Sequence, residues 1–391
     1  MLLSLYLHFP FCKRKCSYCD FCSAAATPDV IAAYCHALEK EIVLSSKTYG
    51  KFPVDTVFLG GGTPSIVPAP LMHEVLSTLR RHFSVLQDSE FTSEANPGTL
   101  TDEWLDVLVE AGMNRLSIGV QAIQVPLLRT LGRIHHFPQA LEALRMAQRH
   151  GLTNLNADAM FGLPGQTQTD YQDTLHALAD TGITHISAYS LILEEGTPLY
   201  QQVKNRELTV PDDDETADML ESGVHLLEKL GFHRYEISNF AKENYECKHN
   251  LGYWRKKRYL GLGVSAASLL PPPNDDPKAC YLRQKNTESV RKYIRMLSEG
   301  KMPIAASTSV YADEAMFETV MLGLRTVDGL RYADFERMHG RNLSEVYGDA
   351  IQTLAKAGLL QPSIPQSPRL ALNERGLLLQ NTALLAFMKD G

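Results

Sequence analysis

The sequence has 391 residues, 44% hydrophobic and 21% charged, which is typical of a soluble globular protein too long for one ordinary domain. Its formal net charge of −7 gives no reason to expect nucleic-acid binding, and no apolar run reaches the roughly 18 residues that a membrane span requires. Four of its seven cysteines fall between positions 12 and 22, which favours metal binding over disulfides and predicts a reducing, cytoplasmic location.

The first half of the chain alternates short β-branched or apolar runs with longer amphipathic runs. The predicted strands cover residues 4–8, 56–60, 90–95, 115–119, 154–161 and 185–190. The predicted helices between them cover residues 28–47, 68–83, 102–111, 138–150 and 169–181. Strand–helix alternation builds a parallel sheet, and six units are too few to close a barrel of eight. We therefore predict an α/β fold with a partial (β/α)6 TIM-like barrel, although periodicity alone also allows a doubly wound sheet.

The regular alternation of predicted strands and helices ends in the second half of the chain. A helix is predicted over residues 212–230, a strand over 232–239 and a proline-rich surface loop over 271–277. The remaining residues are mainly helical, with short strand candidates at 359–360 and 370–372, a pattern that resembles a winged-helix module.

We expect three parts: the barrel over residues 1–240, a connecting segment over 241–287 and a C-terminal, mainly helical, winged-helix-like module over 288–391. A winged helix often binds DNA, but this acidic chain offers no basic recognition face. We therefore expect the C-terminal module to cap the barrel or to dock a partner.

The strongest signal is a cysteine loop directly after the first predicted strand, Cys12-Lys-Arg-Lys-Cys16-Ser-Tyr-Cys19. Three thiolates at these spacings can bind three irons of a [4Fe–4S] cubane and leave the fourth iron open. A zinc site is the alternative, because Cys16, Cys19 and Cys22 repeat every third residue. Zinc usually takes ligand pairs from separated segments, and the sequence has no second pair at such a distance, so we favour a cluster. Cys22 could act beside the cluster or simply fill the loop.

Polar loops follow the next four predicted strands. Backbone N–H groups of Gly60-Gly61-Gly62-Thr63-Pro64 could approach a carboxylate or phosphate closely. Glu94 could accept hydrogen bonds from an ammonium group or a ribose, Gln121 offers a donor and an acceptor, and Arg133 could clamp a carboxylate. Asp158 lies in a strand expected to be buried on both faces, where a carboxylate is costly without a partner. Each signal alone also fits a turn, a solvated strand end or a surface residue, but their repetition at consecutive strand ends predicts one ligand site.

The chain resembles the radical S-adenosylmethionine (SAM) family of oxygen-independent coproporphyrinogen III oxidase and its relatives. The motifs that carry the resemblance are the cysteine loop, Tyr6-Leu-His8-Phe-Pro-Phe-Cys12, Gly60-Gly-Gly-Thr-Pro64, Glu94-Ala-Asn-Pro97, Gly119-Val-Gln121 and Asp158. It implies a [4Fe–4S] cluster on Cys12, Cys16 and Cys19, whose open iron chelates SAM. The positions that contact this SAM match Tyr6, Gly61 and Glu94. Positions that hold a second SAM in the oxidase match Gly62, Thr63, Gln121, Arg133 and Asp158.

This family has two branches. The oxidase decarboxylates two propionates of coproporphyrinogen III, whereas the HemW-type heme chaperones bind heme and pass it to respiratory proteins. Three features favour the chaperone branch. The chain starts at its first predicted strand, without the oxidase's N-terminal extension, and Phe21 stands where the oxidase has an additional cysteine. Lys248-His249-Asn250-Leu-Gly-Tyr253-Trp254 also matches the chaperones' His-Asn-x-x-Tyr-Trp motif.

The resemblance implies that His249 binds heme, because imidazole is a common axial ligand and Tyr and Trp supply flat apolar surface. The alternative is a buried aromatic turn in which His249 is hydrogen-bonded in place. The expected function is a heme chaperone that binds a [4Fe–4S] cluster, one or two SAM molecules and heme, and delivers heme to respiratory hemoproteins.

Two other functions stay open at this point. One is a coproporphyrinogen III oxidase or another porphyrin-directed radical enzyme. The other is a binding module in which the cluster is structural and SAM is never cleaved. Peripheral membrane association and a homodimer are also left open.

Overall fold

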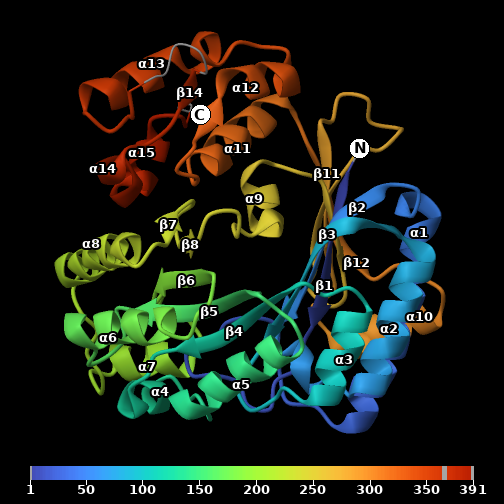
Figure 1. Ribbon diagram of the computed structural model, residues 1–391. Helices are drawn as coiled ribbons and strands as arrows, with labels where there is room; N and C mark the ends of the chain where they lie inside the picture. Colours follow the sequence, from blue (N-terminus) through green and yellow to red (C-terminus); the bar gives the residue numbers. More distant parts are fainter. Residues whose placement is uncertain (1, 363–367, 389–391) are drawn as a thin grey trace.

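The computed structural model describes residues 2–362 and 368–388. Its main feature is a 12-stranded mixed sheet in the order β12-β11-β10-β9-β1-β2-β3-β4-β5-β6-β8-β7 (Figure 1). Among these residues, no helix combines the length and the apolar character needed to cross a membrane.

Six neighbouring strands of this sheet are parallel and form a partial barrel. They are β1 (Leu3–Phe9), β2 (Pro53–Gly61), β3 (Ser84–Ala95), β4 (Arg115–Gln121), β5 (Asn154–Phe161) and β6 (His185–Ser190). The helices that connect them are α1 (Pro28–Tyr49), η1 (Pro64–Ile66), α2 (Ala69–His82), α3 (Asp102–Glu110), α4 (Val125–Thr130), α5 (Phe137–Arg149) and α6 (Gln168–Ala179). The (β/α)6 prediction is therefore confirmed.

Local sequence explains why these elements form. All seven residues of β4 are buried, as expected for a parallel strand covered on both faces. Two of the helices begin at side chains that accept backbone hydrogen bonds: Thr101 caps α3, and Thr167 forms a capping box with Asp170 at α6. The apolar faces of these helices pack on the sheet and form one continuous core with it.

The sheet continues past both ends of the barrel. Beyond β1, the added strands are β9 (Tyr259–Leu262), β10 (Ala267–Leu270), β11 (Tyr281–Asn286) and β12 (Ile304–Val310), with α10 (Val290–Ser298) against α1. Beyond β6 lie α7 (Pro198–Lys204), α8 (Asp213–Lys229), β7 (His233–Arg234) and β8 (Asn239–Ala241). The strand predicted over residues 232–239 is thus two short strands that pair with each other.

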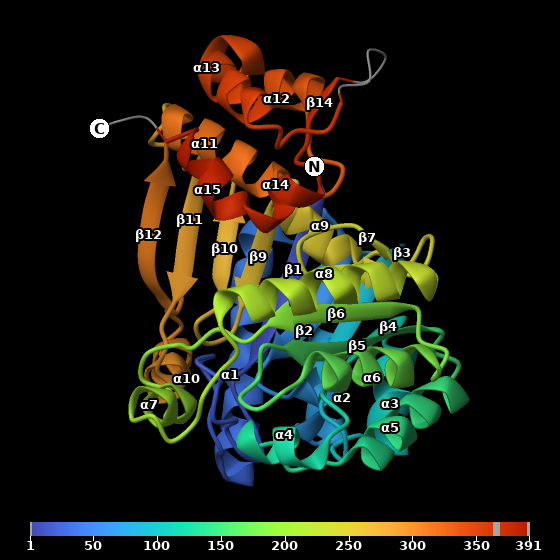
Figure 2. The same cartoon turned by 90° about the vertical axis from the view of Figure 1, so that its left-hand side faces the viewer.

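The C-terminal residues form a helical module with its own core, which begins at Met316. Its elements are α11 (Ala312–Gly323), β13 (Leu330–Arg331), α12 (Tyr332–His339), α13 (Leu343–Lys356), β14 (Arg369–Leu370), α14 (Glu374–Leu378) and α15 (Gln380–Leu385). Figures 1 and 2 show these helices gathered above the barrel in both views. The division of the chain at residue 288 stays a prediction, but the large sheet continues past that position to Val310.

One short helix, α9 (Lys248–Trp254), contacts both β2 of the barrel and α11 of the C-terminal module. Its N-terminal backbone N–H groups at Lys248 and His249 donate to the Glu90 carboxylate on β3, at 2.8 and 2.9 Å. Carboxylates are favourable at this end of a helix because they satisfy unpaired N–H groups and match the helix dipole. The helix is therefore fixed against the interior of the barrel.

Candidate functional site

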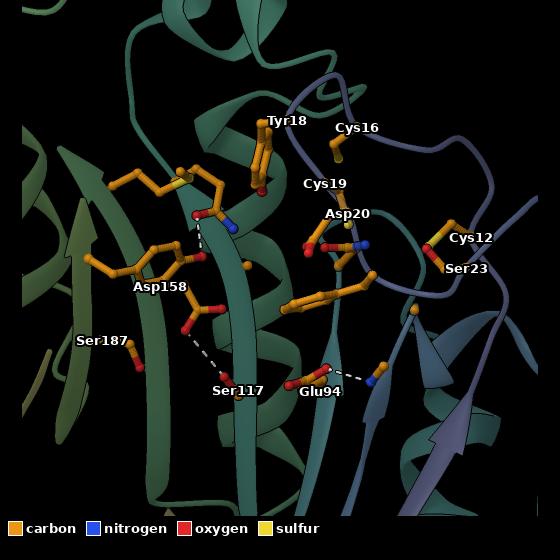
Figure 3. Close-up of a pocket in the computed structure, with 18 of the residues that line it drawn as sticks. Cys12, Cys16, Tyr18, Cys19, Asp20, Ser23, Glu94, Ser117, Asp158 and Ser187 are labelled. Atoms are coloured by element: carbon orange, nitrogen blue, oxygen red, sulfur yellow. Dashed lines mark hydrogen bonds between the residues drawn. The ribbon is translucent and has the colours of Figure 1, made fainter. Parts of the chain in front are cut away.

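A cavity of about 520 Å³ opens at the carboxyl ends of the barrel strands. In Figure 3, Cys12, Cys16 and Cys19 lie along one loop, with Glu94 and Asp158 on the strands below it. The cavity brings together nine of the twelve predicted site residues: Cys12, Cys16, Cys19, Gly61, Gly62, Glu94, Gln121, Arg133 and Asp158. Ligand sites of parallel α/β sheets occupy the same end of the strands.

The three cysteines of the loop are free thiols with hydrogen-bond donors beside them. Thr63 Oγ1 lies 3.5 Å from Cys12 Sγ, and Arg133 Nη1 lies 3.5 Å from Cys16 Sγ. Burial raises the pKa of the Cys19 thiol. Hydrogen bonds to sulfur tune the properties of iron–sulfur clusters. The donor set therefore fits a cluster.

The glycine loop after β2 passes closely beneath the cysteine loop. Gly61 has φ +105°, and a Cβ atom there would lie 2.4 Å from the ring of His8. A Cβ atom on Gly62 would lie 2.5 Å from the carbonyl oxygen of Phe11. Only glycine fits at either position, because no L side chain has room and Gly61 is in the left-handed region.

Two carboxyl groups, Glu94 and Asp158, occupy the floor of the cavity. Burial and the negative charge of Asp158 raise the pKa of Glu94 to about 8. Burial also raises the pKa of Asp158, although Asn156 Nδ2 donates to its Oδ1 at 2.8 Å. Two acidic groups that share a desolvated site favour the binding of a cation.

The lining of the cavity also includes a cation, Arg133, and the side-chain amide of Gln121. Arg133 donates through Nη2 to the carbonyl oxygen of Gly119. Its Nε atom is buried and has no hydrogen-bond partner among the described residues. Tyr189 Oη donates to Gln121 Oε1 at 2.9 Å. A buried donor without a partner points to a ligand, and guanidinium groups bind carboxylates well.

Two predicted residues lie just outside this cavity. Tyr6 lines a neighbouring cavity that shares Gly61 and Glu94 with the first. Thr63 lies behind the cysteine loop, where Asn96 Nδ2 donates to its hydroxyl at 2.7 Å. Both residues therefore border the site.

His249 differs most from its predicted role. Its side chain is buried, with Nδ1 2.9 Å from Thr56 Oγ1 and Nε2 3.0 Å from Tyr253 Oη. The ring also stacks on Phe58 at 5.0 Å, and it does not line the cavity. Since both ring nitrogens are hydrogen-bonded, neither is free for heme iron in this conformation. The geometry favours the alternative reading, a buried aromatic turn that holds His249 in place.

Sequence reasoning gave no role to His8. Tyr6 Oη is 3.0 Å from His8 Nδ1, and His8 Nε2 is 2.9 Å from the carbonyl oxygen of Cys22. The carbonyl can only accept, so Nε2 carries the proton and Tyr6 donates to Nδ1. His8 thus fastens the end of the cysteine loop to β1. The sequence indicated a contact between these side chains only through their spacing, because His8 lies two residues after Tyr6 on the same face of the strand.

Comparisons with known proteins agree with these features. Residues 6–178 match the model of the Radical SAM superfamily, and residues 310–379 match that of the HemN C-terminal domain. The heme chaperone HemW of Bacillus subtilis is 34% identical over 388 residues, which cover 99% of each chain. HemW of Lactococcus lactis is 31% identical over 99% of this chain and 97% of its own, and HemW of Escherichia coli 34% identical over 85% of each.

The fold has also been seen in a solved structure. Coproporphyrinogen III oxidase (HemN) from Escherichia coli, described as a radical SAM enzyme, aligns with a TM-score of 0.83 and 23% identity. The alignment covers 98% of this chain and 89% of the oxidase. At this identity the similarity establishes the fold.

Proposed function

Because the chain belongs to the HemW family of radical SAM proteins, we propose that it is a heme chaperone that binds a [4Fe–4S] cluster, SAM and heme and delivers heme to respiratory hemoproteins. The observation that carries the proposal is one cavity that collects three free cysteines of a single loop together with acidic and basic groups from the ends of the barrel strands.

The proposed cluster ligands are Cys12, Cys16 and Cys19. Thr63 and Arg133 would donate hydrogen bonds to the sulfurs of Cys12 and Cys16, as their distances suggest. When bound, the cluster supplies an open iron that chelates SAM and an electron that can cleave it. The protein's own part is to hold the loop in place, through Thr63, Arg133 and the His8 contact.

The proposed SAM site uses both signs of charge in the cavity. Glu94 would attract the positively charged groups of the SAM on the cluster, while Asp158 and Arg133 would pair with the ammonium and carboxylate groups of a second SAM. Tyr6, Gly61 and Glu94 are assigned to the SAM on the cluster. The residues assigned to a second SAM are Gly62, Thr63, Gln121, Arg133 and Asp158.

The test is an anaerobic titration of cluster-reconstituted protein with heme, followed by incubation with an apo-hemoprotein. We expect heme to bind and then to appear on the acceptor, as seen by absorption spectroscopy. No binding to the reconstituted protein contradicts the proposal. Release of 5′-deoxyadenosine after reduction shows whether the cluster cleaves SAM or is only structural.

The second candidate function is oxygen-independent coproporphyrinogen III oxidation. It is favoured by the fold shared with the oxidase. Anaerobic incubation with coproporphyrinogen III, SAM and a reductant separates the two. Loss of substrate carboxylates as carbon dioxide identifies an oxidase, whereas unchanged substrate supports the chaperone function.

A further inference from the structure

A second cavity, of about 790 Å³, opens on the other side of the segment that follows Cys19. We call it the side cavity; its walls include Pro10, Lys15, Phe21, Cys22, Lys285 and Val290. Its volume lies within the range of about 300–1,000 Å³ found for ligand pockets. It adjoins the first cavity, and the two have in common Lys15, Asp20, Phe21, Ser23, Gly61 and Glu94.

The side cavity combines apolar surface with two cations. Phe21 is 61% exposed at its rim, an unusual position for a phenylalanine, and Pro10 and Val290 add apolar surface. Lys15 and Lys285 come from segments far apart in the sequence. Lys15 Nζ donates to the carbonyl oxygen of Phe21 at 2.9 Å, and Lys285 Nζ lies 2.6 Å from Glu288 Oε1.

The charges at this rim limit the kind of ligand. The acidic residues Asp20, Glu94 and Glu288 line the cavity together with the two lysines, so it is not a simple anion site. A ligand whose affinity comes mainly from apolar surface, with carboxylates that reach the lysines, fits better than a small anion.

Two further groups point to a ligand. Ser23 is 9% exposed and lines both cavities, and its hydroxyl has no hydrogen-bond partner among the described residues. Cys22 Sγ makes a weak contact, 3.4 Å, with the carbonyl oxygen of Glu288. Burial and Glu288 raise the pKa of the Cys22 thiol, whereas Lys15 and Lys285 lower it, so both cations lie within electrostatic reach of the sulfur.

We infer that the side cavity is the heme site, in which Cys22 binds the iron, Lys15 and Lys285 face the two propionates and Phe21 covers the macrocycle. Heme is a flat apolar ring with two carboxylates and an iron that accepts a thiolate. The thiol proton passes to solvent as the Fe–S bond forms, and no electron is transferred. This inference rests on the proposed heme-chaperone function and deepens it, since His249 offers no free nitrogen.

The experiment compares heme with heme dimethyl ester on anaerobic, cluster-reconstituted full-length protein. We expect Lys285→Glu to weaken heme binding about tenfold or more, because a charge-assisted contact is lost and a repulsive one created. The same variant should bind the dimethyl ester, which has no propionate charge, as the unmodified protein does. Lys301→Glu is the matched control, because Lys301 also pairs with an exposed glutamate, Glu299 at 2.8 Å.

The ligand assignment is tested by Cys22→Ser, with Cys280→Ser as the control at another partly buried cysteine. We expect Cys22→Ser to change the absorption spectrum of bound heme while iron and sulfide content stay at the level of the unmodified protein. An unchanged heme spectrum in Cys22→Ser overturns the assignment of Cys22 as the iron ligand. An unchanged heme affinity in Lys285→Glu overturns the placement of heme in the side cavity. If the unmodified protein binds no heme, the proposed function itself fails.

Discussion

His249 Nδ1 lies 2.9 Å from Thr56 Oγ1, so α9 and β2 are joined by a hydrogen bond between two buried side chains. Tyr253, one helical turn further along α9, is bonded to the other ring nitrogen. The His-Asn-x-x-Tyr-Trp sequence therefore has a structural task that needs no ligand: it holds α9 against the barrel.

The first prediction concerns this contact. His249→Ala should lower the free energy of unfolding by about 2–4 kcal/mol, because it leaves a cavity against Phe58 and removes two buried hydrogen bonds. Urea denaturation of the cluster-free protein measures the change, with the exposed His73→Ala as control. Unchanged stability together with complete loss of heme binding would instead favour His249 as the heme ligand.

The second prediction concerns the cluster. Cys16→Ala should lose the brown chromophore and most of the iron after anaerobic reconstitution, because two thiolates of one short loop hold a cubane poorly. Cys280→Ala, outside the cysteine loop, should keep both. Iron and sulfide analysis with absorption spectroscopy decides, and full iron content in the Cys16 variant contradicts the ligand assignment.

The third prediction concerns pH. The pKa of Glu94 is raised to about 8 by burial and by Asp158, above its ordinary value of 4.5. Between these pH values the folded protein holds a proton that the unfolded chain has released, so Glu94 makes stability fall as pH rises through this window. Glu94→Gln removes this dependence, and the variant should gain stability relative to the parent, by roughly a few kcal/mol, on going from pH 5 to pH 9.

Urea denaturation of the cluster-free protein at both pH values measures this difference, with the exposed Glu103→Gln as control. At pH 9, where Glu94 is ionised, the same substitution should weaken SAM binding to the reconstituted protein about tenfold, because a carboxylate that faces a cation is lost. Equal pH profiles for the variant and the parent would show that Glu94 titrates normally.

The parts of the fold that were predictable are those set by local pattern. The six barrel strands and the cysteine loop follow from periodicity and spacing within short segments. The extension of the sheet was not predictable, because the four residues of β9 pair with β1 from more than 250 positions away. The burial of His249 was only one of two predicted alternatives for the same reason: its partner Thr56 is 193 residues distant.

The last prediction concerns the joint between the barrel and the C-terminal module. Lys256 follows α9, and its side chain is 1% exposed, with Nζ 3.0 Å from Glu318 Oε2 and 2.7 Å from the carbonyl oxygen of Ala315, both on α11. Lys256→Met should cost about 3 kcal/mol, because removing one member leaves part of a buried pair uncompensated. The C-terminal module should then become the first site of limited proteolysis.

The double variant Lys256→Met/Glu318→Met separates charge from packing. It should recover much of the loss, since replacing both members of a buried pair by apolar side chains is often nearly neutral. Arg283, the other partner of Glu318, keeps Glu314 at 3.3 Å. Lys301→Met is the control for losing an exposed lysine. If the single variant matches the parent in urea denaturation and in protease resistance, Lys256 does not hold the module in place. If the double variant is no more stable than the single one, the loss comes from the missing hydrogen bond to the Ala315 carbonyl oxygen and not from the unpaired charge of Glu318.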